Sequence, residues 1–233
     1  MHRDTLYRYQ NYLVFITHLK SLGKTTVTSE DMAARVGVTA SRVRQDMMAL
    51  RLTGRPHAGY RITDMEMLIY SMLDLLAPKP MALVGVGKLG SSLAQRDIWA
   101  HTGFELMALF DSDPCLVGTI VADIPIRHTT DMIETIGRQG IVAACITVPN
   151  EQAQNAANLL VTAGIQGIWN FTRVDLDVPR HVIVENQRLE QGLMTLSFLM
   201  GQARRSDPQD NYAASSASSS PLPDNSDAGD SKE

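Results

Sequence analysis

A glycine-rich turn between two apolar runs has the residue types and spacing to hold the phosphates of a dinucleotide. The first run, Met81 to Val84, leads into a G-x-G-x-x-G turn. In such a turn Gly85 permits the tight bend, Gly87 lets a pyrophosphate approach the backbone, and Gly90 lets the next helix pack closely on the sheet. The start of that helix would present unpaired N–H groups to the phosphates. The predicted phosphate loop consists of Gly85, Val86, Gly87, Lys88, Leu89 and Gly90.

An acidic residue follows the glycine turn at the distance that a dinucleotide site requires. Asp111 ends the apolar run F-E-L-M-A-L-F-D, 21 residues after Gly90. A carboxylate there can accept hydrogen bonds from ribose hydroxyls and would repel a 2′-phosphate, so the pattern predicts NAD(H) rather than NADP(H). The alternative is an ordinary strand-turn-helix without a ligand. The strand before the turn, the helix after it and the position of Asp111 together favour nucleotide binding.

A second kind of chemistry, the reading of DNA bases, is indicated by two short helices near the N-terminus. Thr28 and Asp31 form a capping-box pattern, and Gly37 should end the helix that follows. Thr39 can cap a second helix from Ala40 to about Leu50. Two capped helices joined by a short turn are typical of a helix-turn-helix unit.

The second helix should present a polar face to the major groove of DNA. Val43, Met47 and Leu50 fall on its inner face, and the outer face carries Ser41, Arg44, Gln45 and Met48, flanked by Arg42. Arg can bond two acceptors of guanine, and Gln can bond two groups of adenine. The alternative is a solvated polar helix face without a partner.

The segment after this helix resembles the wing of a winged helix. Gly54 and Gly59 flank a tip that contains His57, and Tyr60 and Ile62 alternate as in a strand. The scattered histidines offer no spacing for a metal site, so none is expected. The expected DNA contacts are Ser41, Arg42, Arg44, Gln45, Arg51, Arg55, His57 and Tyr60.

Length and composition set the limits on what else the chain can be. With 233 residues, of which 44% are hydrophobic, it can form about two globular domains. It has neither an apolar stretch long enough to cross a bilayer nor a signal-peptide pattern, which predicts a cytoplasmic protein. Cys115 and Cys145 lie in or beside apolar segments and are expected to be buried free thiols.

Charge is distributed unevenly along the chain. Residues 1–64 carry ten Lys or Arg against five acidic residues, residues 65–205 carry ten against fourteen, and residues 206–233 carry one against six. A basic N-terminal part on an acidic body is consistent with phosphate contacts at one end only. A solvated charged surface would give the same count.

The first and last segments before the tail both read as amphipathic helices. Tyr9, Leu13 and Ile16 mark one buried stripe in a helix from Thr5 to about Leu22. The final helix is too apolar for an exposed end and should pack against a partner subunit, with packing on its own core as the alternative. Its large apolar residues are Leu189, Leu193, Leu196, Phe198 and Met200. The tail from Ser206 is polar and is expected to be disordered.

Several motifs, in order and spacing, resemble the Rex family of redox-sensing transcriptional repressors from about Thr5 to Met200. They are V-T-A-S-R-V-R-Q-D, G-Y-R-I, L-V-G-V-G-K-L-G-S-S-L-A, F-D-S-D-P-C-L-V-G, I-T-V-P, G-I-W-N-F and N-Q-R-L-E-Q-G-L-M-T-L-S-F-L. The resemblance implies an α/β protein with a winged helix-turn-helix over 1–78, a Rossmann-type parallel-sheet domain over 79–186 and a swapped C-terminal helix over 187–205. The disordered tail then covers 206–233.

The resemblance also assigns residues to the second half of the cofactor and names positions where this chain departs from the family. Those expected beside the nicotinamide are Thr147, Val148, Pro149, Asn170 and Phe171. Lys88 stands where the family usually has Asn, the wing sequence differs, and Val14, Arg96 and Arg188 replace residues that help to couple head, core and swapped helix.

The resemblance implies a homodimeric repressor that binds operator DNA and releases it when NADH replaces NAD in the core. One alternative is the same architecture with another adenine nucleotide or an acyl-CoA as ligand. Another is a small NAD-dependent dehydrogenase, but Asp175, Asp177 and His181 are better explained as turn residues than as an acid–base set. The sequence therefore predicts a regulator and not an enzyme.

Overall fold

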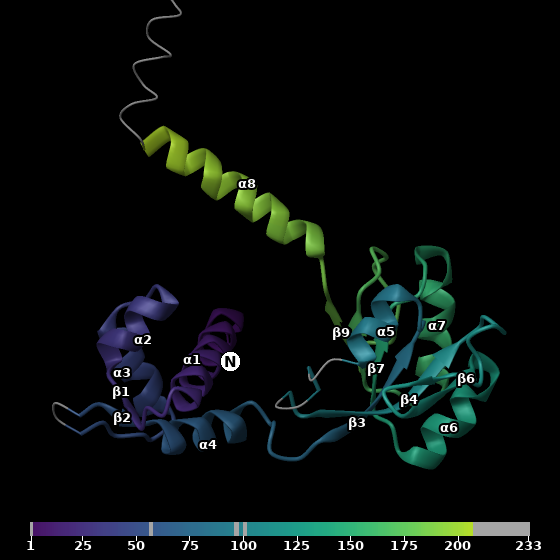
Figure 1. Ribbon diagram of the computed structural model, residues 1–233, viewed down its shortest axis with the longest axis horizontal. Coiled ribbons are helices and arrows are strands. Elements are labelled where there is room, and N and C mark those ends of the chain that lie inside the picture. The colour runs from purple at the N-terminus through teal and green to yellow at the C-terminus, as the bar shows by residue number, and fades with distance from the viewer. Residues whose placement is uncertain (1, 56–57, 96–97, 100–101, 207–233) are drawn as a thin grey trace, which may run out of the picture. The chain divides into compact units, whose positions relative to one another are not determined.

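The computed structural model describes residues 2–55, 58–95, 98–99 and 102–206, and the chain divides into one unit that ends at Glu185 and another that begins at Asn186 (Figure 1). The first unit contains a helical head and a core built on a seven-stranded sheet. The tail from 207, expected to be disordered, lies outside the described residues, as do His57 and Arg96.

The head is a helix-turn-helix with a short antiparallel sheet. Its elements are α1 (Arg3–Ser21), β1 (Thr26–Val27), α2 (Ser29–Val36), α3 (Ala40–Ala49), β2 (Tyr60–Arg61) and α4 (Ile62–Met72). Val27 pairs with Tyr60 across β1 and β2. The expected strand alternation is wrong at Ile62, which begins α4 and is buried with Met65 and Ile69 on one face of that helix.

The local signals that start and end the helices of the head act as predicted. The Thr28 hydroxyl accepts a hydrogen bond from the Asp31 N–H at 3.1 Å and completes a capping box with the Asp31 carboxylate. Gly37 ends α2 in the left-handed conformation with φ 75°. The Thr39 hydroxyl accepts from the Arg42 N–H at 3.2 Å and starts α3. The turn between the two helices is therefore determined by neighbouring residues.

A buried carboxylate fixes α3 against α1. Asp46 is 4% exposed, and its two oxygens accept hydrogen bonds from Arg8 at 2.8 and 3.0 Å. Tyr12 donates to the same carboxylate at 3.0 Å. The hydrogen bond to Asp46 raises the pKa of Arg8, and burial raises the pKa of Tyr12. The hydrogen bonds of Arg8 and Tyr12 to Asp46 therefore hold α3 in a defined orientation against α1.

The core sheet has the strand order β5-β6-β4-β3-β7-β8-β9. Its strands are β3 (Lys79–Val84), β4 (Phe104–Asp111), β5 (Ile120–Val121), β6 (Ile124–His128), β7 (Ala143–Ile146), β8 (Gly167–Asn170) and β9 (Ile183–Asn186). From β6 to β8 neighbouring strands are parallel, whereas β5 pairs antiparallel with β6. The strand order reverses between β3 and β7, where a doubly wound sheet opens a crevice at its carboxyl ends.

The two faces of the sheet are covered unequally. The core helices are α5 (Lys88–Ala94), the short η1 (Thr129–Asp131), α6 (Met132–Gln139) and α7 (Asn150–Thr162). On one face, Val84 and Phe110 pack with residues of α6 and α7 such as Ile136 and Leu160. On the other face, Leu83 packs with Leu93 of α5 and with partly buried aromatic side chains. Because both faces are buried, β3 is apolar at consecutive positions instead of alternating.

The two cysteines have different environments. Both are free thiols, as predicted, but only Cys145 is buried, and Cys115 is exposed against expectation. Cys145 lies in the apolar strand β7, and its burial raises the pKa of the thiol to about 12. Cys115 follows Asp113 in a turn, where the Cys115 N–H donates to the Asp113 carboxylate. The apolar residues next to Cys115 in the sequence therefore belong to a surface turn.

The second unit begins at Asn186 and contains the helix α8 (Leu189–Ser206). The apolar residues singled out in this helix expose between 50% and 70% of their surface, namely Leu189, Leu193, Leu196, Phe198 and Met200. They bury little within the single chain. In the part of the chain that the structure describes, no helix is both long enough and apolar enough to span a bilayer.

Two glycines of the head offer a matched test of backbone strain against close packing. Gly37 and Gly59 both have positive φ, but a Cβ on Gly37 would meet nothing within 4 Å, whereas one on Gly59 would lie 2.2 Å from the carbonyl oxygen of Val27. We expect Gly37→Ala to cost about 1 kcal/mol for the left-handed backbone. Gly59→Ala should cost roughly 1–3 kcal/mol more because of the clash.

Urea unfolding of the two variants measures this difference directly. Equal losses of unfolding free energy in Gly37→Ala and Gly59→Ala would show that the close approach of Gly59 to the Val27 carbonyl does not constrain the wing.

Candidate functional site

Two glycines of the loop after β3 allow three chain segments to meet. Gly85 has φ 94°, and a Cβ there would lie 2.8 Å from the backbone nitrogen of Val148. A Cβ on Gly90 would lie 1.9 Å from the carbonyl oxygen of Gly85 and 2.8 Å from the Thr147 hydroxyl. Larger side chains at these positions would push α5 away from the ends of β3 and β7. The predicted roles of Gly85 and Gly90 therefore agree with the packing.

Gly87 differs, because no contact among the described residues requires a glycine there. A Cβ on Gly87 would meet no atom within 4 Å, and the φ of −65° is accessible to any residue. The space that this Cβ would enter is open. A ligand that approaches the backbone closely, as a pyrophosphate does in this motif, would explain the glycine. The loop thus fits the group that the sequence predicts.

A cavity of about 680 Å³ lies at the carboxyl ends of the strands, next to this loop. Six of the twelve predicted cofactor residues line it, namely Gly85, Gly87, Asp111, Thr147, Val148 and Pro149. They come from the ends of β3, β4 and β7, on both sides of the point where the strand order reverses. This is where ligands bind in open α/β sheets.

The Asp111 carboxylate is held in place by backbone N–H groups. One oxygen accepts from the Val86 N–H at 2.6 Å, and the other accepts from the Asp113 N–H at 2.9 Å. Each carboxylate oxygen can accept more than one hydrogen bond, so both retain capacity for ribose hydroxyls. The contact with Val86 also ties the end of β4 to the glycine loop. Asp111 is therefore oriented before any ligand arrives.

The segment after β7 supports the same loop from the other side. The Thr147 hydroxyl donates to the Gly85 carbonyl at 2.6 Å, and the Thr147 N–H donates to the Val84 carbonyl at 2.9 Å. Val148 and Pro149 follow, and Pro149 directly precedes the first residue of α7. The side chains of Val148 and Pro149 give the cavity an apolar wall beside the polar loop.

The remaining loop residues lie outside the cavity wall. Val86 is buried at 3% exposure in the cluster on the α5 face, and Gly90 packs against Gly85. Lys88 and Leu89 are exposed in the first turn of α5. Lys88 adds a positive charge near the loop, but it does not line the cavity.

The two residues at the end of β8 depart from the expectation. Asn170 is fully buried, where its amide donates to the Val174 carbonyl at 2.9 Å and accepts from the Thr172 hydroxyl at 2.7 Å. It organises the turn after β8, so its side chain is not presented to a ligand in this structure. Phe171 is half-buried and stacks edge-on against Trp169. Neither Asn170 nor Phe171 lines the cavity.

Several polar cavity residues were not found from the sequence. They are Ser112, Asp113, Thr129, Gln152 and Asn155. The first two directly follow Asp111, and Thr129 follows β6, so the rule that ligands bind beyond strand ends could have found them. Gln152 and Asn155 lie on α7 and carry no such signal.

The outer face of α3 presents the polar residues that the helix-turn-helix pattern predicts. Val43 and Met47 are completely buried, whereas Ser41, Arg42, Arg44 and Gln45 are exposed. The Arg44 guanidinium contacts the Ser29 hydroxyl at 3.1 Å and the Glu30 carboxylate at 3.2 Å. Hydrogen bonds from its own backbone and from Ser29, with a smaller effect of Arg44, lower the pKa of Glu30. An exposed ion pair of this kind contributes little and can open for a phosphate or base.

The wing supplies two exposed basic residues and one correction. Arg51, with φ 58°, and Arg55, which pairs antiparallel with Gly59, are both exposed. Tyr60 is only 6% exposed and belongs to the apolar core of the head. Its ring lies 3.0 Å from the position of a Cβ on Gly54. We therefore remove Tyr60 from the expected DNA surface, since its side chain braces the hairpin from inside.

Comparison with protein families agrees with both parts. A family model described as a putative DNA-binding protein N-terminus matches residues 3–47, and one described as a CoA binding domain matches residues 77–174. The fold and the site thus define a helix-turn-helix head joined to a nucleotide-binding core of the Rossmann type.

Individual relatives identify the family. The redox-sensing transcriptional repressor Rex of Clostridium botulinum is 34% identical over 176 residues, which cover 76% of this chain and 84% of the relative. The crystal structure of RSP, a Rex-family repressor, in complex with β-NADH matches with a TM-score of 0.79 and 28% identity, over 88% of this chain and 96% of that one. The RSP complex with β-NAD+ and operator DNA matches with a TM-score of 0.78 and 27% identity, over 94% and 99%. This chain belongs to the Rex family.

Gly87 and Gly90 allow ligand binding to be separated from folding. We expect the free energy of unfolding of Gly87→Val to stay within about 0.5 kcal/mol of that of the parent, because the new side chain enters open space. The same variant should lose NADH binding. Gly90→Ala should lose roughly 1–3 kcal/mol of stability through overpacking. Thermal unfolding and calorimetric titration with NADH measure both effects. A Gly87→Val protein that binds NADH like the parent would place the phosphates elsewhere.

Proposed function

We propose that the protein is a dimeric repressor that binds operator DNA and releases it when NADH replaces NAD in the core. The observation that carries the proposal is the cavity beside Gly87 and Asp111, on the same chain as the exposed polar face of α3. Relatives of the same fold have been solved with NADH and with NAD+ and operator DNA. A role on DNA requires the cytoplasmic location predicted from the sequence.

Residues at the cavity account for the choice of NAD(H). The backbone around Gly87 would approach the pyrophosphate, while Asp111 would bind the adenine-side ribose and repel a 2′-phosphate. Lys88 would add attraction for the phosphates without changing that choice. When bound, the cofactor supplies a nicotinamide ring that is cationic when oxidised and neutral when reduced.

The apolar surroundings of the nicotinamide would distinguish the two oxidation states. Val148 and Pro149 line the cavity, and Phe171 follows the next strand end. Burial of an unpaired charge is costly, so a closed apolar environment favours the neutral ring of NADH. If NADH also favours a dimer in which the two α3 helices no longer match neighbouring half-sites, the operator is released.

DNA contacts would divide into those that read bases and those that hold phosphates. Arg44 and Gln45 lie on the exposed face of α3 and would read bases in the major groove. Arg42, Arg51 and Arg55, with Ser41, would contact the backbone. We also retain His57 as a tip contact, although it lies outside the described residues.

The dimer would form through α8. Its apolar side chains are exposed in the single chain, and burial against a second copy would remove that surface from water. Val14 is 65% exposed on α1, and Arg188 precedes α8. Arg96 lies outside the described residues. These three positions, where the chain departs from the family, would set how strongly the cofactor affects DNA binding.

The ligand could differ within the same architecture, and the match to a CoA binding domain over residues 77–174 favours that second candidate. Thermal-shift measurements with NADH, NAD, NADPH, ADP and CoA at equal concentration separate the two. The largest stabilisation by NADH supports the redox role, whereas the largest by CoA supports the alternative. Because the relatives are repressors, we propose no catalytic role for the core.

Operator release is the direct test of the redox role. An operator is first selected by this protein from random duplexes, and its affinity is measured by gel shift at fixed salt with saturating NAD or NADH. A hundredfold loss of affinity in NADH would correspond to about 2.7 kcal/mol of coupling. Gly87→Val should bind the operator without responding to NADH, and Arg44→Ala should lose selective binding.

The possible outcomes separate the two halves of the proposal. An operator affinity unmoved by NADH would reject redox sensing and leave DNA binding intact. Failure to enrich any sequence would reject the role of α3.

Two truncations test the assembly. Removal of residues 187–233 should convert the dimer to a monomer, because it deletes the apolar face of α8. Removal of 207–233 alone should leave the dimer intact and serves as the control. Sedimentation equilibrium gives the mass in each case, and a stable dimer of the shorter protein would exclude assembly through α8.

A further inference from the structure

Three aromatic rings form a continuous row on the α5 face of the sheet. Phe171 and Trp169 have ring centroids 4.5 Å apart at 68°, and Trp169 and Trp99 have centroids 6.1 Å apart at 89°. Both contacts are edge-to-face, the arrangement that aromatic rings favour. Trp169 is the middle ring and contacts both others.

One end of the row lies beside the cofactor segment. The Phe171 N–H donates to the carbonyl of Ile146 at 3.0 Å. This bond fixes the backbone of Phe171 beside the end of β7, directly before Thr147. Thr147 in turn bonds to Gly85 and lines the cavity. The backbone of Phe171 is therefore fixed, while the direction of its ring depends on what the ring packs against.

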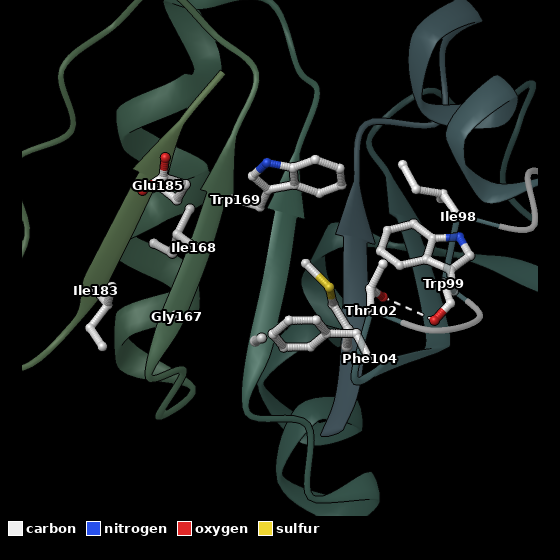
Figure 2. Close-up of a pocket in the computed structure, with 11 residues that line it drawn as sticks. Ile98, Trp99, Thr102, Phe104, Gly167, Ile168, Trp169, Ile183 and Glu185 are labelled. Atoms are coloured by element: carbon white, nitrogen blue, oxygen red, sulfur yellow. Dashed lines mark hydrogen bonds between the residues drawn. The ribbon is translucent and has the colours of Figure 1, made fainter. Parts of the chain in front are cut away.

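The other end of the row borders a separate apolar cavity. Figure 2 shows Trp99 and Trp169 beside this cavity of about 320 Å³, together with Phe104 near the starts of the strands. The Trp99 indole N–H donates to the Leu93 carbonyl of α5 at 3.1 Å, and Thr102 holds the Trp99 carbonyl. Trp99 is thus tied to the helix that begins at the glycine loop.

We infer that Trp169 is a positioning residue for the nicotinamide end of the site: its ring, supported by Trp99, holds the Phe171 ring in place. This inference rests on the proposed function, which puts the nicotinamide ring near Phe171. Loss of the middle ring would leave Phe171 free to turn, because close-packed side chains hold each other's rotamers. Asp111, which would bind the adenine-side ribose, lines the cavity at the strand ends, and none of the three rings lines that cavity.

Ligands with and without nicotinamide separate positioning from general stability. The dissociation constants of NADH and of ADP-ribose, which lacks the nicotinamide, are measured by calorimetry on the full chain. We expect Trp169→Leu to weaken NADH about fivefold to tenfold, the equivalent of one aromatic contact, and to leave ADP-ribose within about twofold. Trp169→Phe, which keeps an aromatic edge, should restore most of the NADH affinity.

A double-mutant cycle tests whether Trp169 connects its neighbours. Trp99→Leu and Phe171→Leu change the two ends of the row, and each contacts the middle ring. Their effects on NADH affinity should be non-additive in the parent and additive in Trp169→Leu.

The outcomes are distinguishable from failure of the proposed function. If the parent binds ADP-ribose but gains nothing from the nicotinamide of NADH, the assignment of the site fails before the row is tested. If the parent prefers NADH and Trp169→Leu weakens both ligands equally or neither, Trp169 has only a structural role and the inference is overturned. Additive effects of the end substitutions in the parent would also overturn it.

Discussion

The site depends on the close crossing of the glycine loop with the segment after β7. Gly90 lies against the Gly85 carbonyl, and Gly85 lies against the Val148 backbone. The Thr147 hydroxyl donates a hydrogen bond to the same Gly85 carbonyl. No side chain at either glycine could be accommodated without moving a backbone. This close approach packs α5 tightly against the ends of β3 and β7. It also places the glycine loop at the edge of the cavity beyond the strand ends. Asp111 completes the arrangement through its bond to Val86.

The head is organised by a comparable constraint on a different chemical basis. The Asp46 carboxylate is almost fully buried, so it depends on hydrogen bonds from Arg8 and Tyr12 in place of water. A rotation of α3 would break these bonds, which gives the exposed face of the helix a fixed direction. In the core, the absence of side chains at Gly85 and Gly90 permits the backbones to approach. In the head, a buried charge prevents the helices from sliding.

Local signals made much of this predictable from the sequence. The caps at Thr28 and Thr39 and the turn at Gly85 depend on residues a few positions apart, and each occurs as predicted. Tyr60 was misjudged because its burial depends on how the residues around it pack into the core of the head, with its ring against Gly54. An alternating pattern shows which side chains share a face, but it does not show which face is covered.

Contacts between residues far apart in the sequence had no local pattern that could predict them. Asp46 looks like any acidic residue on a polar helix, and its role emerges only when α1 brings Arg8 to it across 38 positions. The aromatic row likewise joins Trp99 to residues about seventy positions later. The family resemblance located the cofactor region, but these long-range partners required the fold.

The pairing of Arg44 with Glu30 bears on how selectively the head can act. If Arg44 reads bases as proposed, a duplex has to offer it acceptors that compete with the Glu30 carboxylate. Because the pair is exposed and contributes little, this competition would adjust the preference of the head for matched bases only slightly.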